Sequence, residues 1–308
     1  MSNTTMTSTA FIAYNFISLI GTIFIGLICI FMLSVLFSSI KRKHDVVFIL
    51  VANNYLALLA FALTAIPINI DTVRGDYNFY IAEETFGCRI QAYILYSFIT
   101  IIFNTFALQA AFRFFRVVSP SYVWLQYGLT YAVIIPILWI FSFLSVLPVH
   151  FWHDIQLMPT ESICVLTIDG TRGFIWCTLI VYGLPVVITS IIYIQLTRFM
   201  HHSSMTVSLR ARRDVIVIRR IVLVIIILML IGAPSVVLKL ILPFTDLGKS
   251  FFYRMSNMTI VIVMLALSLM LVYVTPQVKE MLMAIGKSNK VTPRYTRQFF
   301  VHATITKN

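Results

Sequence analysis

The chain has 308 residues, of which 60% are hydrophobic and only 11% are charged, and its mean hydropathy is +0.94. A soluble domain carries about 25% charged residues, so this composition excludes an ordinary soluble protein and favours one whose solvent is lipid. The net charge of +12 does not indicate nucleic-acid binding, because the basic residues stand in short clusters between apolar runs.

Seven apolar runs are long enough to cross a bilayer as helices, which takes about 20 residues each. We expect spans over residues 11–38, 46–70, 90–117, 124–149, 174–199, 216–243 and 253–275. The strands of a membrane barrel would alternate in hydropathy and be about half as long. The predicted fold class is therefore an all-α membrane protein, a seven-transmembrane helix bundle over residues 11–278, without an internal repeat.

The charges predict which way up the bundle lies. Basic residues gather in one set of connections and in the tail, whereas the opposite set holds few bases, Arg254 among them, and most of the acids: Asp71, Asp76, Glu83, Glu84, Asp154, Glu161, Asp169 and Asp246. Because basic loops remain in the cytoplasm, we expect an extracellular N-terminus over residues 1–10 and a multi-pass protein of the plasma membrane. Asn3 begins a glycosylation sequon in that segment.

The end of the chain has a different pattern. After Pro276, apolar residues recur at helical spacing between charged ones: Val278, Met281, Leu282 and Ile285. This pattern predicts a short amphipathic helix on the inner leaflet. Residues 276–308 are thus expected to form that helix and a basic cytoplasmic tail.

None of the four cysteines has the spacing of a metal ligand, and no metal site is expected. Cys29 and Cys177 fall inside apolar runs, which favours buried free thiols. Cys88 and Cys164 fall on the predicted outer side, where the oxidising environment allows a disulfide.

Several residues stand at spacings typical of one family. Arg113 follows Cys88 by 25 residues, at the end of the third predicted span. Aromatic and proline residues occupy matching positions in the next three spans: Trp139, Pro185, Tyr193 and Pro234. Over essentially the whole chain this pattern resembles the rhodopsin-like family of G-protein-coupled receptors.

The resemblance implies several roles. Cys88 and Cys164 would form the disulfide that ties the third helix to the second outer loop. Arg113 would bond a docking helix of a heterotrimeric G protein, although an arginine at a helix end can also be a snorkelling anchor. Pro185 removes a backbone hydrogen bond and permits a bulge, and Pro234 should kink its helix.

Two further residues belong to the implied switch. Tyr193 would face the inner half of the bundle and meet Arg113 when the receptor opens, unless it is only an interfacial aromatic residue. Asp214 stands 20 residues before Pro234, where the family often has an acid that pairs with the third-helix arginine. A local role is equally open, in which Asp214 neutralises Arg212 or Arg213.

The chain also departs from the family pattern. Phenylalanines flank Arg113 in place of an acid and a tyrosine, and Gly232 stands where the family has the switch tryptophan. Leu267 to Leu271 replace the Asn-Pro-x-x-Tyr motif, and residues 46–70 contain no acid. These losses predict a bundle centre that has been emptied of polar groups.

The ligand is only weakly indicated. No lysine lies between Phe251 and Tyr273, which argues against retinal, and Leu95 replaces the aspartate of amine receptors. Leu95, its neighbour Tyr96 and the intramembrane Lys239 are the candidate pocket residues. The acidic outer side would attract a cationic ligand such as a basic peptide, but the rule of basic inner loops alone produces the same acidity.

Motifs of hydrolases and nucleotide-binding enzymes are absent, so no enzyme, no cofactor and no nucleic-acid partner are expected. The expected function is a receptor in the lipid bilayer that converts binding of an unidentified extracellular ligand into activation of a heterotrimeric G protein. The alternatives are a small seven-helix transporter or channel, or a signalling-dead receptor-like scaffold.

Overall fold

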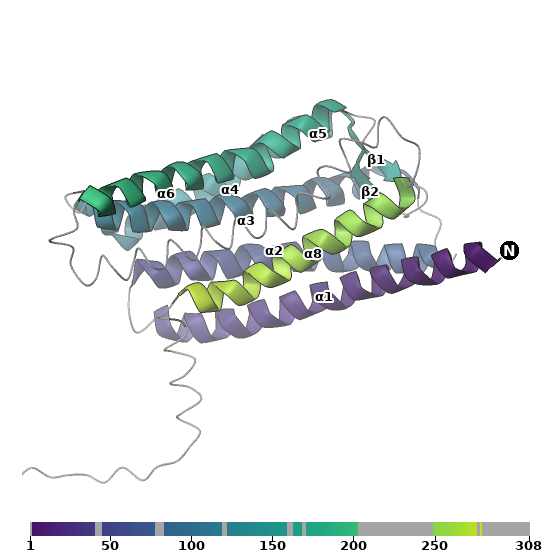
Figure 1. The fold of residues 1–308 in the computed structure, drawn as a ribbon, viewed down its shortest axis with the longest axis horizontal. Helices are drawn as coiled ribbons and strands as arrows, with labels where there is room; N and C mark the ends of the chain where they lie inside the picture. The colour runs from purple at the N-terminus through teal and green to yellow at the C-terminus, as the bar shows by residue number, and fades with distance from the viewer. Residues whose placement is uncertain are drawn as a thin grey trace, which may run out of the picture.

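The computed structural model of this chain describes residues 2–40, 45–77, 83–118, 122–158, 163–167, 171–202, 249–275 and 278. Over these residues the protein is mostly helical, and its long helices lie alongside one another (Figure 1). Six helical segments are long and apolar enough to cross a membrane. The described part of the chain is therefore that of a multi-pass membrane protein with six candidate spans.

In chain order the elements are α1 (Ser2–Ile40), α2 (Val46–Asp76), α3 (Phe86–Val118), η1 (Val123–Gln126), α4 (Gly128–Phe151), β1 (Ile155–Met158), β2 (Ile163–Leu166), α5 (Thr171–Cys177), η2 (Thr178–Gly183), α6 (Leu184–His202) and α8 (Lys249–Val274). Segments α5, η2 and α6 follow one another without a gap and share one candidate span, Arg172–Leu196. Helix α1 includes residues 2–10, and its candidate span begins at Ile12.

Six of the seven predicted spans fall on these helical segments. The predicted span at 216–243 lies outside the described residues, and so does the predicted amphipathic helix after Pro276, apart from Val278. The all-α fold class needs one correction, because β1 and β2 form an antiparallel hairpin. Strands form there because Ile155, Cys164 and Leu166 bury one face of the hairpin in the core cluster while intervening residues stay more exposed.

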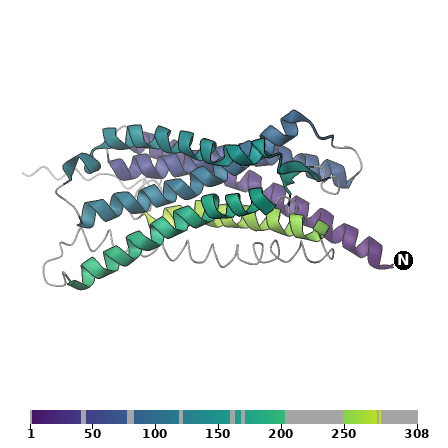
Figure 2. The same cartoon turned by 90° about the horizontal axis from the view of Figure 1, so that it is seen from above.

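Helix α3 has the most neighbours along the bundle. It packs against α2, α4 and α6, and at one end it also contacts both strands of the hairpin. Helix α1 packs against α2 and α8, so the first and last described helices are neighbours (Figure 1). Figure 2 turns the bundle by 90° and shows that the long helices share one general direction in this view as well.

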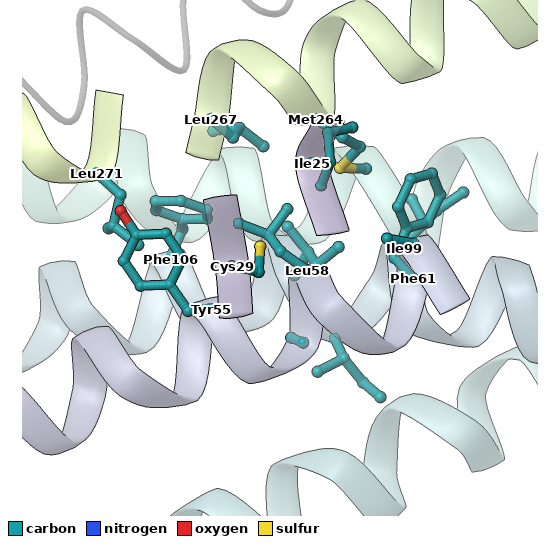
Figure 3. Close-up of a cluster of buried hydrophobic side chains, with 14 of the residues drawn as sticks. Ile25, Cys29, Tyr55, Leu58, Phe61, Ile99, Phe106, Met264, Leu267 and Leu271 are labelled. Carbon is teal, nitrogen blue, oxygen red and sulfur yellow. The ribbon is translucent and has the colours of Figure 1, made fainter. Parts of the chain in front are cut away.

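The core between these helices consists of large apolar side chains. Tyr55, Leu58 and Phe61 of α2 are fully buried, and side chains of α1, α3 and α8 surround them. Figure 3 shows this cluster, with Ile25, Cys29, Ile99, Phe106, Met264, Leu267 and Leu271. Cys29 and Cys177 are both buried free thiols, which confirms the prediction.

The outer faces of the helices are also apolar. Ile20 of α1 and Leu63 of α2 are each 63% exposed, and Leu129 of α4 is 78% exposed. Scattered exposed apolar residues are normal in soluble proteins, but whole helix faces of this kind mark contact with another apolar phase. These faces fit the hydrocarbon of a bilayer.

A local irregularity precedes Pro185. Residues Thr178–Gly183 form a π-helical segment, and Pro185 follows at the start of α6. Proline has no N–H for the carbonyl four residues earlier, so a regular α-helix would leave that group unpaired. The bulge predicted at Pro185 is thus present, immediately before the proline.

Gly21 marks a close approach between α1 and α8. A Cβ atom at Gly21 would lie 2.7 Å from Cγ1 of Val261, whereas a Cβ at Gly26 would lie 3.8 Å from Cβ of Ala62. Valine in a helix has essentially one rotamer, so Val261 cannot turn away. We expect Gly21→Ala to lower the free energy of unfolding by about 1–3 kcal/mol.

Gly26→Ala is the matched control on the same helix, because its added methyl group makes only an ordinary contact. Thermal unfolding of the two purified variants in one detergent measures the difference. Since alanine is the better helix former, Gly26→Ala should be neutral or stabilising. Equal melting temperatures for both variants would contradict the close approach of α1 and α8.

Candidate functional site

One end of the bundle is closed by the hairpin, and we call it the disulfide end because it holds the bond between Cys88 and Cys164. The Cα atoms of these cysteines are 5.6 Å apart, and 76 positions separate them in the sequence. Thr85 Oγ1 accepts a hydrogen bond from the Cys88 backbone N–H at 3.2 Å, which satisfies one free donor of the first turn of α3. The predicted disulfide between α3 and the segment that follows α4 is confirmed.

The hairpin is held to the bundle by more than the disulfide. Its base is closed where Thr167 donates both its backbone N–H and its hydroxyl to the Asp154 carbonyl, each at 3.0 Å. Ile155 and Leu166 face each other across the strands and are buried. The hairpin therefore covers the start of α3 as an ordered layer.

Of the predicted pocket residues, Tyr96 and Leu95 lie on α3 near the hairpin. The Tyr96 hydroxyl accepts a hydrogen bond from the Leu166 backbone N–H at 3.4 Å. Leu95 is half-buried against the apolar core. Lys239, the third predicted pocket residue, lies outside the described residues.

Arg113 lies on the same helix as Cys88, near the opposite end of the bundle. The 25 residues between them span about 37 Å of α-helix. Arg113 is only 3% exposed. Arg116, one turn further, is half-buried with its guanidinium 6.0 Å from the centre of the Phe112 ring.

The other residues of the predicted switch are only partly described. Pro185 is buried at the start of α6, and Tyr193 lies on the same helix between Pro185 and the helix end at His202. Asp214 and Pro234 lie outside the described residues. The pairing of Asp214 with Arg113 therefore stays a prediction.

The predicted absence of polar groups in the bundle centre is wrong. Asn54 of α2 donates its amide to Gln109 Oε1 of α3 at 3.1 Å, and both side chains are 1% exposed. Trp139 of α4 donates its indole N–H to Asn53 Oδ1 at 3.1 Å. The prediction rested on missing acids and missing family motifs. The polar groups in the bundle centre are instead neutral amides, which form hydrogen bonds between helices.

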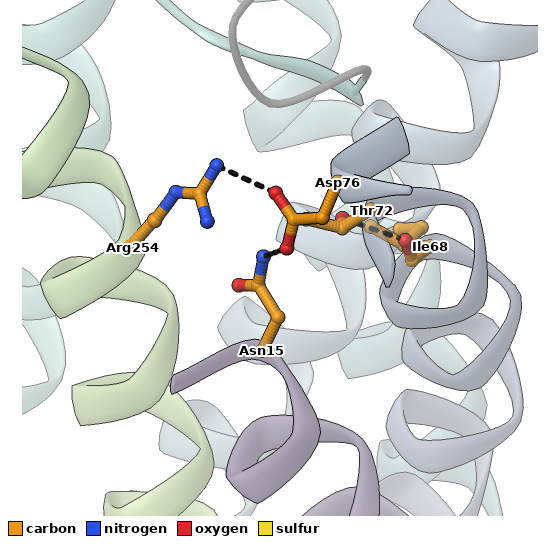
Figure 4. Close-up of polar contacts among 5 residues, drawn as sticks. All are labelled: Asn15, Ile68, Thr72, Asp76 and Arg254. Atoms are coloured by element: carbon orange, nitrogen blue, oxygen red, sulfur yellow. Dashed lines mark hydrogen bonds and ion pairs between the residues drawn. The ribbon is translucent and has the colours of Figure 1, made fainter. Parts of the chain in front are cut away.

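A second polar group lies between α1, α2 and α8 at the disulfide end (Figure 4). Arg254 Nη2 of α8 lies 2.8 Å from Asp76 Oδ1 of α2, and the two side chains are 6% and 8% exposed. The other oxygen of Asp76 accepts a hydrogen bond from the Asn15 amide of α1 at 2.6 Å. Both carboxylate oxygens of Asp76 thus have a partner, each from a different helix.

The same three helices share a second set of contacts. Asn257 of α8 donates its amide to Asn69 Oδ1 of α2 at 2.9 Å, and Asn69 donates to Thr22 Oγ1 of α1 at 3.0 Å. We call these residues the three-helix seam: Asn15, Thr22, Asn69, Asp76, Arg254 and Asn257. From the sequence, Asp76 was expected in a connection and Arg254 at the start of the last predicted span, and the other four residues were not among the predicted site residues. Amides and a threonine within apolar runs were the available signal.

The ends of the described bundle differ in the number of their acids. Acids cluster at the disulfide end, in α2 or beside α3 and the hairpin: Asp71, Asp76, Glu83, Glu84 and Asp154. Among the described acids, Asp45 alone lies at the other end, where it caps α2 by accepting from the Val47 N–H at 3.2 Å. Arg113, Arg116 and Arg198 lie towards that second end. The disulfide end also holds as many described bases as acids: Arg74, Arg89, Arg172, Lys249 and Arg254. Most of the bases that predict the orientation lie outside the described residues, so the predicted charge asymmetry stays a prediction.

The titratable side chains of the described residues do not form a metal centre. Within these residues, no group of three or more histidine, cysteine, aspartate or glutamate side chains could hold a metal ion.

Comparisons with known proteins add no identity. No protein-family model matches the sequence, and no curated protein matches it. The sequence and the structure together show a multi-pass membrane protein whose described residues are mostly helical, with six candidate spans and a disulfide that fastens a hairpin over the start of α3.

Proposed function

We propose that this protein is a seven-helix receptor of the rhodopsin-like type, which couples an extracellular ligand to a heterotrimeric G protein. The observation that carries the proposal is the arrangement of α3. This helix is bonded through Cys88 to the hairpin at one end and holds the buried Arg113 towards the other. Helix α3 thus connects the end under the hairpin, where we place the ligand, with the end that holds Arg113, where we place the G protein.

The course of the chain supports a seventh span. Helix α6 runs away from the disulfide end and ends at His202, while α8 begins at Lys249 and has its Arg254 paired at the disulfide end. These two helix ends thus lie at opposite ends of the described bundle. The sequence between them contains the apolar run at 216–243, which is long enough for a seventh crossing.

The orientation follows from the charges. In the sequence most of the basic residues stand in the connections and the tail that follow the ends opposite the disulfide, and basic connections remain in the cytoplasm. With seven spans, the N-terminus and the hairpin lie outside and the C-terminal tail lies inside the cell. The outside is also the compartment where a disulfide persists.

The proposed mechanism is a shift between two arrangements of the bundle. A ligand near Tyr96 and the hairpin would bind one arrangement more tightly and so increase its population. The π-helical segment before Pro185 is the place where the fifth span can adjust, because its backbone hydrogen bonds are already irregular. Movement of α6 would then expose Arg113 to the G protein.

Expression in cells with a panel of G-protein chimeras tests the proposal without a known ligand. We expect basal signalling above that of mock-transfected cells with at least one chimera. Signalling with none of the chimeras, by protein that reaches the cell surface, would contradict the proposal. Uptake of a solute by such cells would favour a transporter, and surface expression without either activity would favour a scaffold.

A further inference from the structure

The ion pair between Asp76 and Arg254 is buried between three helices of a membrane protein, α1, α2 and α8. Charged groups are costly in such a place unless they are paired and hydrogen-bonded. Here the pair is closed at 2.8 Å, more than nine-tenths buried, and completed by the amide of Asn15. We propose that Asp76 and Arg254 form a conformational lock that holds α8 against α1 and α2 at the disulfide end.

The ion pair should stabilise the contact between α2 and α8 strongly, because removing either charge alone is destabilising. If Asp76 were neutral, the buried guanidinium of Arg254 would lose the carboxylate that lies 2.8 Å from it, and removal of one buried partner is strongly destabilising. Asp76 is also the last residue of α2, so its side chain reaches both neighbouring helices from a helix end. This geometry ties three separate helices through one carboxylate.

The remaining contacts of α8 also join it to α1 and α2. Asn257 bonds through Asn69 to Thr22 about one turn along α8, and the close approach of Gly21 and Val261 brings α1 and α8 together. Further along, the Tyr55 hydroxyl of α2 donates to the Ser268 carbonyl at 3.0 Å. Helix α8 is thus fastened to α1 and α2 along its length, with the ion pair at one end.

This lock has a consequence for movement that rests on the proposed function. Helices α1, α2 and α8 form the stationary part of the bundle, and the rearrangement that exposes Arg113 takes place in the helices outside this group. Helix α6, whose main helix neighbour in the described bundle is α3, is in position to move. Release of the lock should therefore loosen α8 itself rather than imitate a ligand.

Thiol labelling of Val261→Cys in the purified protein tests the lock without any G protein. Val261 is 4% exposed and faces Gly21, so the introduced cysteine reports separation of α1 from α8. We expect slow reaction with N-ethylmaleimide in this parent variant. Adding Asp76→Asn should speed labelling about tenfold or more, because loss of a buried partner lowers the free energy of local opening.

Three controls sharpen this test. Protein without Val261→Cys gives the background from Cys29 and Cys177, which are both buried. Asp71→Asn is the matched charge removal, since Asp71 pairs with Arg74 at 3.8 Å on an exposed turn of the same helix. Asp71→Asn should label at the parent rate. Arg254→Lys keeps the charge but loses the guanidinium, and it should label between the rates of the parent and of Asp76→Asn.

Labelling of the Asp76→Asn variant at the parent rate, or at the rate of Asp71→Asn, would overturn the proposal. If Asp76→Asn does not yield folded protein, the exchanged pair Asp76→Arg with Arg254→Asp decides. Recovery of folded protein with slow labelling would support the lock, since Asn15 can turn its amide to accept from an arginine. Failure of this exchange, while Asp71→Arg with Arg74→Asp folds, would refute it. A receptor that couples to no G protein would leave these outcomes unchanged.

Discussion

Replacement of Cys164 by serine is expected to lower the free energy of unfolding by about 2–4 kcal/mol. The bond with Cys88 closes a loop with a sequence separation of 76, and its removal returns conformational freedom to that chain in the unfolded state. The hairpin would then be held to α3 chiefly by the bond from Leu166 to Tyr96 and by its buried side chains. Thermal unfolding of the purified protein in detergent measures the effect.

The free cysteine Cys177 provides the matched control. It is buried to a similar degree, 7% exposed against 5% for Cys164, but it forms no disulfide. Cys177→Ser should therefore change stability much less than Cys164→Ser. The double variant of Cys88 and Cys164 should be no less stable than the single one, because the bond is lost only once. A fall of equal size in the Cys177 variant would show that the thiol environment, not the cross-link, is responsible.

Replacement of Arg113 by alanine is expected to reduce G-protein coupling by about tenfold or more. The proposed function makes Arg113 the group that bonds the docking helix of the G protein, and loss of a buried charged contact at an interface weakens binding by about 2 kcal/mol or more. The residue is suited to this role because it is 3% exposed in the described bundle and can be presented only when the helices rearrange. Basal signalling per receptor at the cell surface gives the measurement.

Arg116→Ala is the control for this prediction. Arg116 lies one turn further on α3, carries the same charge and is less buried, with its guanidinium 6.0 Å from the Phe112 ring centre. An arginine that only anchors the helix end contributes charge near the membrane surface, and either residue could supply it. Equal loss of signalling in both variants would therefore favour anchoring over a specific contact of Arg113.

Some features could be predicted from residues that are close together in the sequence. A span depends on the summed hydropathy of about 20 neighbours, so six predicted spans coincide with helices of the structure. The break before Pro185 could be predicted because one residue lacks an N–H. The resemblance implied the disulfide, and the residues alone allowed it, because Cys88 and Cys164 both lie outside the apolar runs.

Other features could not be predicted in this way. The hairpin was missed because its strands have four residues each and are defined by burial against α3 rather than by a long pattern. The amide contacts of Asn53 and Asn54 were missed because an asparagine in an apolar run does not reveal which helix it faces. Asp76 was assigned to a connection and Arg254 to the edge of a span because charged residues usually end a span, and hydropathy does not show that the two meet.

The sequence by itself determined that this chain is a helical membrane protein, how its long apolar segments divide, and which end of the bundle is acidic. These properties are sums over neighbouring residues, and they hold whatever the helices pack against. Only the tertiary structure decided how the helices are joined. Asn15 and Arg254 lie 61 and 178 residues from Asp76, and their meeting depends on the rotation and tilt of three helices. Hydropathy does not encode that rotation, whereas close packing and the high cost of an unpaired buried charge select it.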